Sequence, residues 1–185
     1  MEIRSILGIE AARQAIINSE YANKYNGQLI IRMADTNSED VYKPAYDMII
    51  EDIKWITKNR AYDITTQSER IDIYYKYALE LINMNKAYVC KCSQEEFRKY
   101  VIKKEACPCR DKSIEENLKE WNKMFTYYNE GDAVLRIKTD LKHKNPAVRE
   151  WPAFRISDSE HPLHGKKYRV WPLMNFAVAI DDHEL

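Results

Sequence analysis

The sequence has no excess of charge of either sign and no long apolar run. Its 29 lysine and arginine residues balance 29 aspartate and glutamate residues, so no overall field attracts nucleic acid and any RNA contact must come from local patches. No segment approaches the roughly 20 apolar residues of a membrane span, and residues 1–8 lack the apolar core and cleavage site of a secretory leader. We therefore expect a soluble cytoplasmic protein without membrane contact, whose cysteines stay reduced.

The order of predicted helices and strands favours an α/β fold. The 185 residues can form one compact domain or a domain with a sizeable insertion. Helical spacing and N-terminal capping residues predict helices that begin near residues 9, 44, 68, 93 and 113 and after residue 172. Short apolar or extended-type runs predict strands at residues 28–33, 87–89, 133–139, 152–156 and 168–171. Residues 35–38 follow the first strand, and ligands of open α/β sheets bind at that carboxyl end.

All four cysteines fall in two C-x-C pairs, Cys90 with Cys92 and Cys107 with Cys109. Two thiolates from each of two tight turns can complete the tetrahedral sulfur shell that zinc prefers. We expect a structural zinc ion, whose four thiolates leave a charge of about −2. The cations placed to offset that charge are Lys91, Arg98, Lys103, Lys104 and Arg110. Two alternatives stay open, namely buried reduced thiols that pack as small hydrophobes, and redox chemistry through one pair.

Cations are concentrated in two segments, residues 138–149 and 165–169, and aromatic residues are interleaved with them. A cationic groove with stacking platforms suits a single-stranded RNA end. The alternative is that the rings belong to the core and the charges form solvated faces. The candidate RNA-binding residues are Lys138, Lys142, Lys144, Arg149, Lys166, Lys167 and Arg169.

Seven segments carry a resemblance to a known family: AIINSEYANKYNGQLIIRMADTN, YKPAYDMIIEDIKWI, QSERIDIYYKYALELI, AYVCKC, CPCR, AVLRIKTDLKHKNPAVREWPAFRI and YRVWPLMNFAVAIDDHEL. In this order they resemble the catalytic domain of class I glutamyl-tRNA synthetases of the archaeal type. The resemblance implies a partial Rossmann-like catalytic sheet with an inserted α+β acceptor-binding domain. Residues 1–87 would be the first part of the catalytic domain, 88–167 the insertion with the zinc site, and 168–185 the return to the catalytic domain.

The resemblance also places a nucleotide signature on Gly8, Ile9, Glu10 and Ala11. In the family, histidines of this signature bind the phosphates of ATP, and neither histidine is present here. Glu10 instead brings a carboxylate toward phosphate, which at about 4 Å costs about 1 kcal/mol in water and about 4 kcal/mol at an effective dielectric of 20. The lysine-rich signature that closes over ATP would follow Leu185. We therefore expect ATP, the cofactor of the family reaction, to bind poorly to this chain.

The amino-acid pocket of the family maps onto Arg32, Asp35, Thr36, Met174 and Asn175. The family carries two adjacent acidic residues in the loop IRMADTN, and Ala34 occupies the place of the first, which holds the substrate ammonium group. Asp35 and Thr36 are explained equally well by loop and cap chemistry. Met174 is explained equally well by core packing, and for Arg32 a structural ion pair with Asp35 or Asp181 is favoured over substrate contact.

Two further groups of polar residues are given no catalytic role. Asp181, Asp182 and His183 fall on adjacent helical positions that face different directions, so a solvated helix end is favoured over a metal site. The other histidines lie in turns without metal-ligand spacing: His143, His161 and His164.

The family reaction is the ATP-dependent ligation of glutamate to tRNA. Because several signature residues are missing, we predict a glutamyl-tRNA synthetase-like catalytic-domain protein without independent ligase activity, and leave open whether it is an enzyme. The alternative is a non-catalytic module that binds a tRNA acceptor end, or that associates with a synthetase or with itself through an open sheet edge. A third hypothesis is an intact enzyme in spite of the substitutions.

Overall fold

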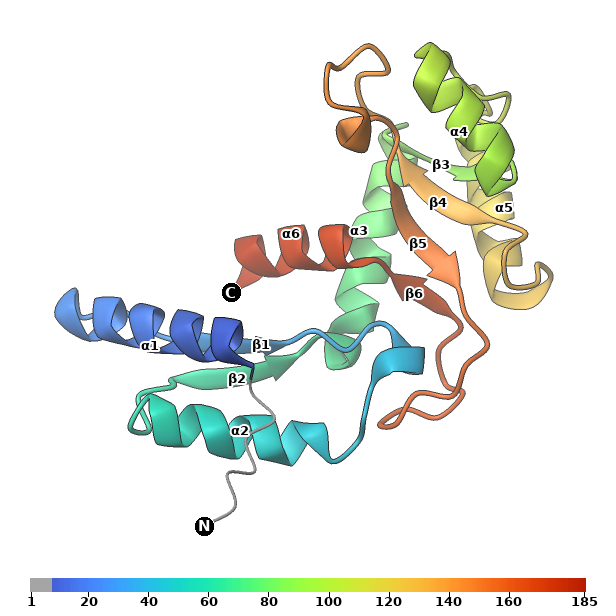
Figure 1. Cartoon of the computed structure of the whole chain (residues 1–185). Helices are drawn as coiled ribbons and strands as arrows, with labels where there is room; N and C mark the ends of the chain where they lie inside the picture. The colour runs from blue at the N-terminus through green and yellow to red at the C-terminus, as the bar shows by residue number, and fades with distance from the viewer. Residues whose placement is uncertain (1–7) are drawn as a thin grey trace. The chain divides into compact units, whose positions relative to one another are not determined.

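The computed structural model describes residues 8–185, which form two compact units (Figure 1). Unit 1 contains the chain up to Glu69 together with His161–Leu163. Unit 2 contains Arg70–Glu160 and His164–Leu185. The division at Arg70 precedes the boundary at residue 88 that the resemblance implies, because the helix after Arg70 packs on the sheet of unit 2.

Unit 1 is a βαβ arrangement with one additional helix. Its elements are α1 (Ile9–Lys24), β1 (Ile30–Met33), η1 (Ser38–Asp40), α2 (Ala45–Ile56) and β2 (Asp63–Thr66), followed by η2 (Gln67–Arg70). β1 and β2 pair in parallel, and Ile31 lies opposite Ile64. The helix and strand predicted for residues 9–33 are both present. Asn26 adopts φ of 54°, a left-handed conformation that asparagine tolerates, and so separates α1 from β1.

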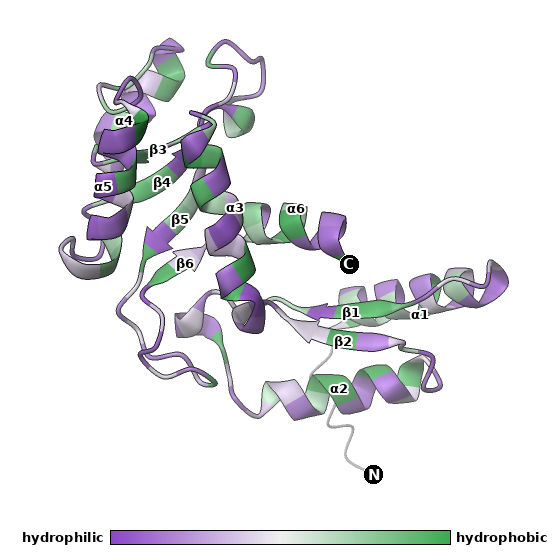
Figure 2. Cartoon of the chain, turned by 180° about the vertical axis from the view of Figure 1, so that it is seen from behind, coloured by the Kyte–Doolittle hydropathy of each residue, from purple (hydrophilic) through white to green (hydrophobic). Residues whose placement is uncertain are grey.

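The buried face of α1 is formed by small residues. Ala15 and Ser19 are buried, whereas Ile16 and Tyr21, two of the apolar residues whose helical spacing predicted this helix, are 43% and 60% exposed. Helical periodicity therefore predicted the helix correctly but not which of its residues are buried. Figure 2 shows hydrophobic and hydrophilic residues alternating along α2, as expected for a helix with one buried face.

Unit 2 is built on a four-stranded antiparallel sheet in the order β3-β4-β5-β6. The strands are β3 (Ala87–Cys90), β4 (Val134–Ile137), β5 (Pro152–Ile156) and β6 (Val170–Pro172). The helices are α3 (Ile71–Asn83), α4 (Gln94–Lys103), α5 (Ile114–Thr126), the short η3 (Pro146–Val148) and α6 (Met174–Glu184). The mixed α/β architecture expected from the sequence is confirmed.

The two faces of this sheet have different surroundings. Leu135 and Phe154 point into the main core, which also contains Trp121 of α5 and Tyr74 of α3. Val134, the neighbour of Leu135 on β4, belongs to a second cluster with residues of β3 and α4. Alternation of side chains along each strand produces this difference. As a result, the large helices cover one face, and the cysteine pairs lie on the other.

Ser68 was expected to cap the helix that ends near Ile82, and this prediction is wrong. The helix begins at Ile71, its N-cap is Arg70, and no side chain caps it. Ser68 lies in η2, where both its backbone N–H and its hydroxyl donate to the carboxylate of Asp35. A tertiary hydrogen bond has therefore replaced the local one that the sequence pattern suggested.

Candidate functional site

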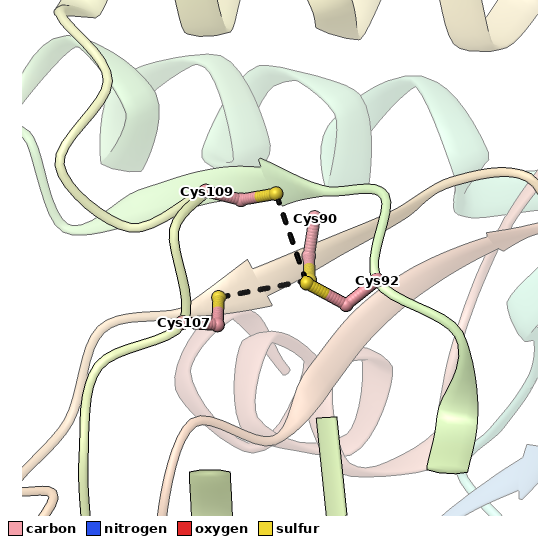
Figure 3. Close-up of side chains that lie close together, drawn as sticks. All are labelled: Cys90, Cys92, Cys107 and Cys109. Carbon is pink, nitrogen blue, oxygen red and sulfur yellow. Dashed lines mark hydrogen bonds between the residues drawn. The ribbon is translucent and has the colours of Figure 1, made fainter. Parts of the chain in front are cut away.

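Four cysteine thiols converge in unit 2 (Figure 3). Cys90 is the last residue of β3 and Cys92 follows it, whereas Cys107 and Cys109 lie in the segment that joins α4 to α5. The Sγ atoms of Cys90 and Cys107 are 3.8 Å apart, and those of Cys92 and Cys109 are 3.9 Å apart. All four Sγ atoms lie within 4.8 Å of one another. They are close enough to hold one metal ion.

The sulfur separations fit a tetrahedral thiolate site. Zn–S bonds of about 2.3 Å at tetrahedral angles place neighbouring sulfur atoms about 3.8 Å apart. The backbone N–H of Lys91 donates to Cys109 Sγ at 3.5 Å, and the hydroxyl of Tyr88 lies 3.5 Å from Cys107 Sγ. Polar contacts of this kind orient metal ligands in many protein sites. The donor set and its surroundings therefore suit zinc.

A capped helix joins the two cysteine pairs. The hydroxyl of Ser93 accepts from the backbone N–H of Glu96 at 3.3 Å, and the Glu96 carboxylate accepts from the backbone N–H of Ser93 at 3.0 Å, so the predicted capping box is present. Lys104 follows α4 in the left-handed conformation, with φ of 62°. Phe97 packs in the same cluster as the buried cysteines. The sequence between the pairs thus folds as a spacer that holds the two turns together.

The charges around the thiols differ in part from the prediction. Lys91 Nζ lies 3.3 Å from Glu120, and Arg110 Nε lies 3.1 Å from Glu150, so both of these predicted cations have carboxylate partners. The hydrogen bond shared with Cys107 raises the pKa of Cys90, and the positive charge of Arg136 opposes that rise. Arg136, which the sequence analysis did not select, is therefore a cation close to the cluster.

The residues predicted to form a degenerate nucleotide signature lie at the start of α1 and are exposed. Gly8 precedes the helix without a side-chain cap, and Glu10 pairs with Arg13 at 3.1 Å on the exposed face. Ala11 lines a cavity of about 340 Å³ in unit 1, together with Arg32 and Ala34. The structure thus brings one signature residue and part of the predicted amino-acid pocket to the same cavity.

Asp35 also lines that cavity, but its side chain is held by the protein itself. The carboxylate is 4% exposed. It accepts hydrogen bonds from the Tyr46 hydroxyl at 2.5 Å, the Ser68 hydroxyl at 2.6 Å and the Ser68 N–H at 2.8 Å. His161 Nε2 lies 2.9 Å from the backbone carbonyl oxygen of Asp35. Of the two explanations for Asp35, the geometry supports the structural one.

Burial and the hydrogen bond to Asp35 raise the pKa of Tyr46, so its hydroxyl stays protonated at neutral pH and donates a hydrogen bond to Asp35. Three partners of Asp35 were not predicted from the sequence, and they come from separate parts of the chain: Tyr46, Ser68 and His161. Thr36, the neighbour of Asp35, is buried as well. No local motif connects these residues, so the sequence contained no signal for the network.

The two other residues predicted for the amino-acid pocket lie in unit 2. Met174 and Asn175 occupy the first turn of α6, and Met174 is 63% exposed, so the core-packing explanation for Met174 is wrong. At the other end of α6, Asp182 and His183 are exposed as predicted. The solvated position predicted for Asp181 is wrong, because its carboxylate is fully buried and pairs with Arg70 Nε at 2.9 Å.

The seven RNA-binding candidates differ in accessibility. Arg149 is buried, and its guanidinium donates to three backbone carbonyl oxygens between 2.6 and 3.1 Å away, so it is a structural residue and no longer a candidate. Arg169 pairs with Asp158, and Lys138 Nζ donates to Asn85 at 2.7 Å. The exposed candidates are Lys142, Lys144, Lys166 and Lys167.

Two of the interleaved aromatic rings belong to the core. Phe154 and Trp171 are fully buried and cannot serve as stacking platforms without unfolding. Trp151 and Tyr168 are partly exposed, and Lys167 Nζ lies 4.6 Å from the centre of the Tyr168 ring. The alternative interpretation of the rings is therefore correct for Phe154 and Trp171.

Comparison with known proteins assigns the chain to a family. Residues 5–185 match the family described as tRNA synthetases class I (E and Q), catalytic domain. The chain belongs to this family. It is 51% identical to the glutamate–tRNA ligase of Methanosphaera stadtmanae over 96% of the chain, and 55% identical to that of Pyrococcus furiosus over 94% of the chain. It covers 31% of the length of each relative.

A solved structure shows the same fold at low sequence identity. The glutamate tRNA ligase from Elizabethkingia meningosepticum, in complex with its amino acid, superposes with a TM-score of 0.65 at 20% identity. The match covers 94% of this chain and 38% of that chain. The resemblance to archaeal-type glutamyl-tRNA synthetases is thus confirmed for the family and the fold. Among residues 8–185, no helix has the length and apolar character needed to cross a membrane.

Proposed function

We propose that this synthetase-like chain has no independent glutamate ligase activity. The supporting observation is the state of the loop after β1, where Ala34 replaces one carboxylate and Asp35 is committed to internal hydrogen bonds. A hydrogen bond between a carboxylate and an ammonium group contributes about 1.5 to 3 kcal/mol, which a methyl group cannot provide. Glu10, exposed at the start of α1, adds repulsion toward a polyphosphate.

Glutamate-dependent exchange between ATP and pyrophosphate tests this proposal. The isolated chain is expected to show no exchange above the protein-free background, while the Pyrococcus furiosus ligase serves as the positive control. An Arg32→Ala variant provides the matched negative control, because Arg32 lines the cavity. Exchange by the chain that disappears in this variant would overturn the proposal and favour the intact-enzyme hypothesis.

The four cysteines are proposed to hold a structural zinc ion, which would link the end of β3 to the turn before α5. The 3.8 and 3.9 Å sulfur separations support this assignment. Protein purified without chelator is expected to contain about one zinc per chain, by mass spectrometry. Cys107→Ser should lose the metal, whereas Pro108→Ala, in the same turn, should retain it. Folded wild-type protein without metal would refute zinc, and a disulfide found in that protein would support the redox alternative.

The alternative function is binding of a tRNA acceptor end. Four exposed lysines support it, at residues 142, 144, 166 and 167. Binding to tRNA is expected to be measurable at about 50 mM salt and to fall steeply by 200 mM, since it would depend on phosphate contacts. A Lys142→Ala, Lys144→Ala variant should bind more weakly. Absence of binding at low salt would exclude this function. We place the protein in the cytoplasm, where such ligases meet their tRNA.

Association with a protein partner is the other alternative, and exposed apolar residues in unit 1 favour it. Ile9 of α1 and Tyr25, which follows α1, are 89% and 67% exposed, and Trp55 of α2 is 82% exposed. Exposed large apolar side chains mark interaction sites in many proteins. Sedimentation velocity is expected to show a dimer that weakens in Trp55→Ser. A monomer at all concentrations, with or without a synthetase, would exclude association.

A further inference from the structure

A groove of about 590 Å³ lies on the face of the unit 2 sheet that carries the cysteines. Strand register determines its lining. Cys90 of β3 lies opposite Val134 of β4, and Val134 lies opposite Arg155 of β5, so the side chains of these residues share one face. Phe97 and Arg98 of α4 border the same groove. It is therefore a preformed hollow between a helix and a sheet.

The groove carries three cationic side chains beside Cys90 and Cys92, two of the proposed zinc ligands. Arg98, Arg136 and Arg155 line it, and none of its lining residues within the described part of the chain is acidic. The rest of the lining is mainly apolar, with Val101, Ala133 and Leu173 among its residues. Three guanidinium groups beside an apolar floor match a ligand that has both anionic groups and a flat or apolar part.

Arg136 shows that this charge is built into the fold. The residue is 8% exposed, and its guanidinium carbon lies 3.4 Å from the centre of the Phe97 ring. One terminal nitrogen donates to the backbone carbonyl of Glu150 at 3.3 Å. Within residues 8–185, however, Arg136 Nε is buried and has no hydrogen-bond partner. A buried donor without a partner is energetically unfavourable, and an anion that reached it from the groove would supply the missing acceptor.

We propose that this groove binds a nucleotide of a single-stranded RNA, with the phosphate at the arginines and the base or ribose against the apolar floor. Guanidinium groups bind phosphate oxygens in a bidentate manner. Bases of unpaired RNA pack on flat or apolar protein surfaces. The proposal deepens the RNA-binding alternative above, because it names the place on unit 2 where an unpaired strand lies. None of the groove arginines was among the RNA-binding candidates predicted from the sequence, although Arg98 was predicted there to offset the charge of the zinc site.

The thiolate cluster is a competing explanation for part of this charge. Arg136 favours ionisation of Cys90, so it contributes to balancing a metal–thiolate group. Arg98 and Arg155 line the groove as well. Arg155 lies on β5, which is separated by β4 from the strand of Cys90, β3. Charge balance at the metal therefore accounts for Arg136 more readily than for the other two arginines, and these two are the residues to test.

The test uses zinc-loaded protein and a fluorescein-labelled single-stranded RNA hexamer, followed by fluorescence anisotropy between 50 and 200 mM salt. Removing Arg98 or Arg155 by substitution with alanine is expected to weaken binding about tenfold each. Each change should also reduce the slope of log affinity against log salt by about 0.7. The control is Lys99→Ala with Lys119→Ala, which removes two exposed charges of unit 2 outside the groove.

Each outcome decides the proposal. The proposal is supported if only the arginine variants bind RNA more weakly and with a smaller salt dependence, while their zinc content is unchanged. Equal losses in the lysine control would overturn it, as would equally tight binding of a hexaglutamate peptide, which would indicate a protein ligand. If Arg155→Ala does not fold, Arg98→Ala and Arg155→Lys provide the same comparison. Binding of tRNA that depends on Lys142 and Lys144 but not on the arginines would refute the groove and leave the RNA-binding function intact.

Discussion

Substitution of Asp35 tests whether this residue of the family's pocket is now structural. In Asp35→Asn, the amide oxygen can still accept from the Ser68 N–H, but the amide nitrogen replaces the oxygen that accepts from two hydroxyl groups. A hydrogen bond to a charged group contributes about 1 kcal/mol more than a neutral one. The two hydroxyl groups can turn to accept from the amide nitrogen, so two charge-assisted hydrogen bonds become neutral ones. This exchange predicts a decrease of about 2 kcal/mol in the free energy of unfolding of unit 1.

Asp35→Ala should be more damaging, because it leaves the buried N–H of Ser68 without an acceptor. Adding a penalty of about 2 kcal/mol for that donor predicts a total decrease of about 4 kcal/mol. Native-state hydrogen exchange at the Ser68 amide measures the effect locally, so it does not require both units to unfold together. Ala34→Ser, at the exposed neighbouring position, is the control and should change stability by less than about 0.5 kcal/mol.

A result for Asp35→Asn within about 0.5 kcal/mol of the wild type would refute the structural role. It would mean that the hydroxyl groups of Tyr46 and Ser68 reorganise without cost, or that water reaches the carboxylate. Asp35 would then be available to a substrate, and the proposal that the chain lacks ligase activity would lose its main support.

Three further predictions concern unit 2. Burial raises the pKa of Glu120, but hydrogen bonds from two lysines and a tyrosine outweigh it and lower the pKa from 4.5 to about 2. The stabilisation of the folded state by Glu120 is therefore complete above pH 4.5 and is lost as the pH falls toward 2. Glu120→Gln should lower the free energy of unfolding by about 1 kcal/mol at pH 7. It should also make that free energy less dependent on pH between 4.5 and 2, as measured by urea denaturation at a series of pH values. Asp181→Asn should lower the free energy of unfolding by about 3 kcal/mol in the same assay, because Arg70 loses its buried carboxylate partner. A decrease below about 1 kcal/mol would contradict the role of this ion pair in the core of unit 2. Ser113→Ala should cost about 1 kcal/mol and speed hydrogen exchange at the Glu116 amide, unless solvent replaces the cap.

Local patterns predicted most of the helices and strands. The capping boxes at Ser93 and Ser113 depend on residues three positions apart, so their signal is complete within a few residues. The C-x-C pairs predicted a four-thiol cluster for a similar reason, since each pair defines its own tight turn and the capped helix between them limits where the second pair can lie. Interactions of short sequence range can be read from the sequence.

Burial was harder to predict than secondary structure. The apolar spacing of α1 indicated a helix, but the large residues Ile9 and Tyr21 are exposed while Ala15 and Ser19 are buried. Periodicity reveals which residues share a face, and the packing partner decides which face is covered. The same limitation explains Arg149 and Asp181, two charged residues whose chemistry suggested solvent exposure and whose partners lie on other elements.

The sequence by itself determined the family, the order of most elements and the grouping of the cysteines, and it predicted a degenerate nucleotide signature, because each depends on residue identity at neighbouring or aligned positions. Only the tertiary structure decided that Asp35 is enclosed by Tyr46, Ser68 and His161, and that Arg136 and Arg155 face a common groove. These contacts join residues far apart in the chain through strand register and packing. Their positions are set when the units fold, and no short segment of sequence contains them.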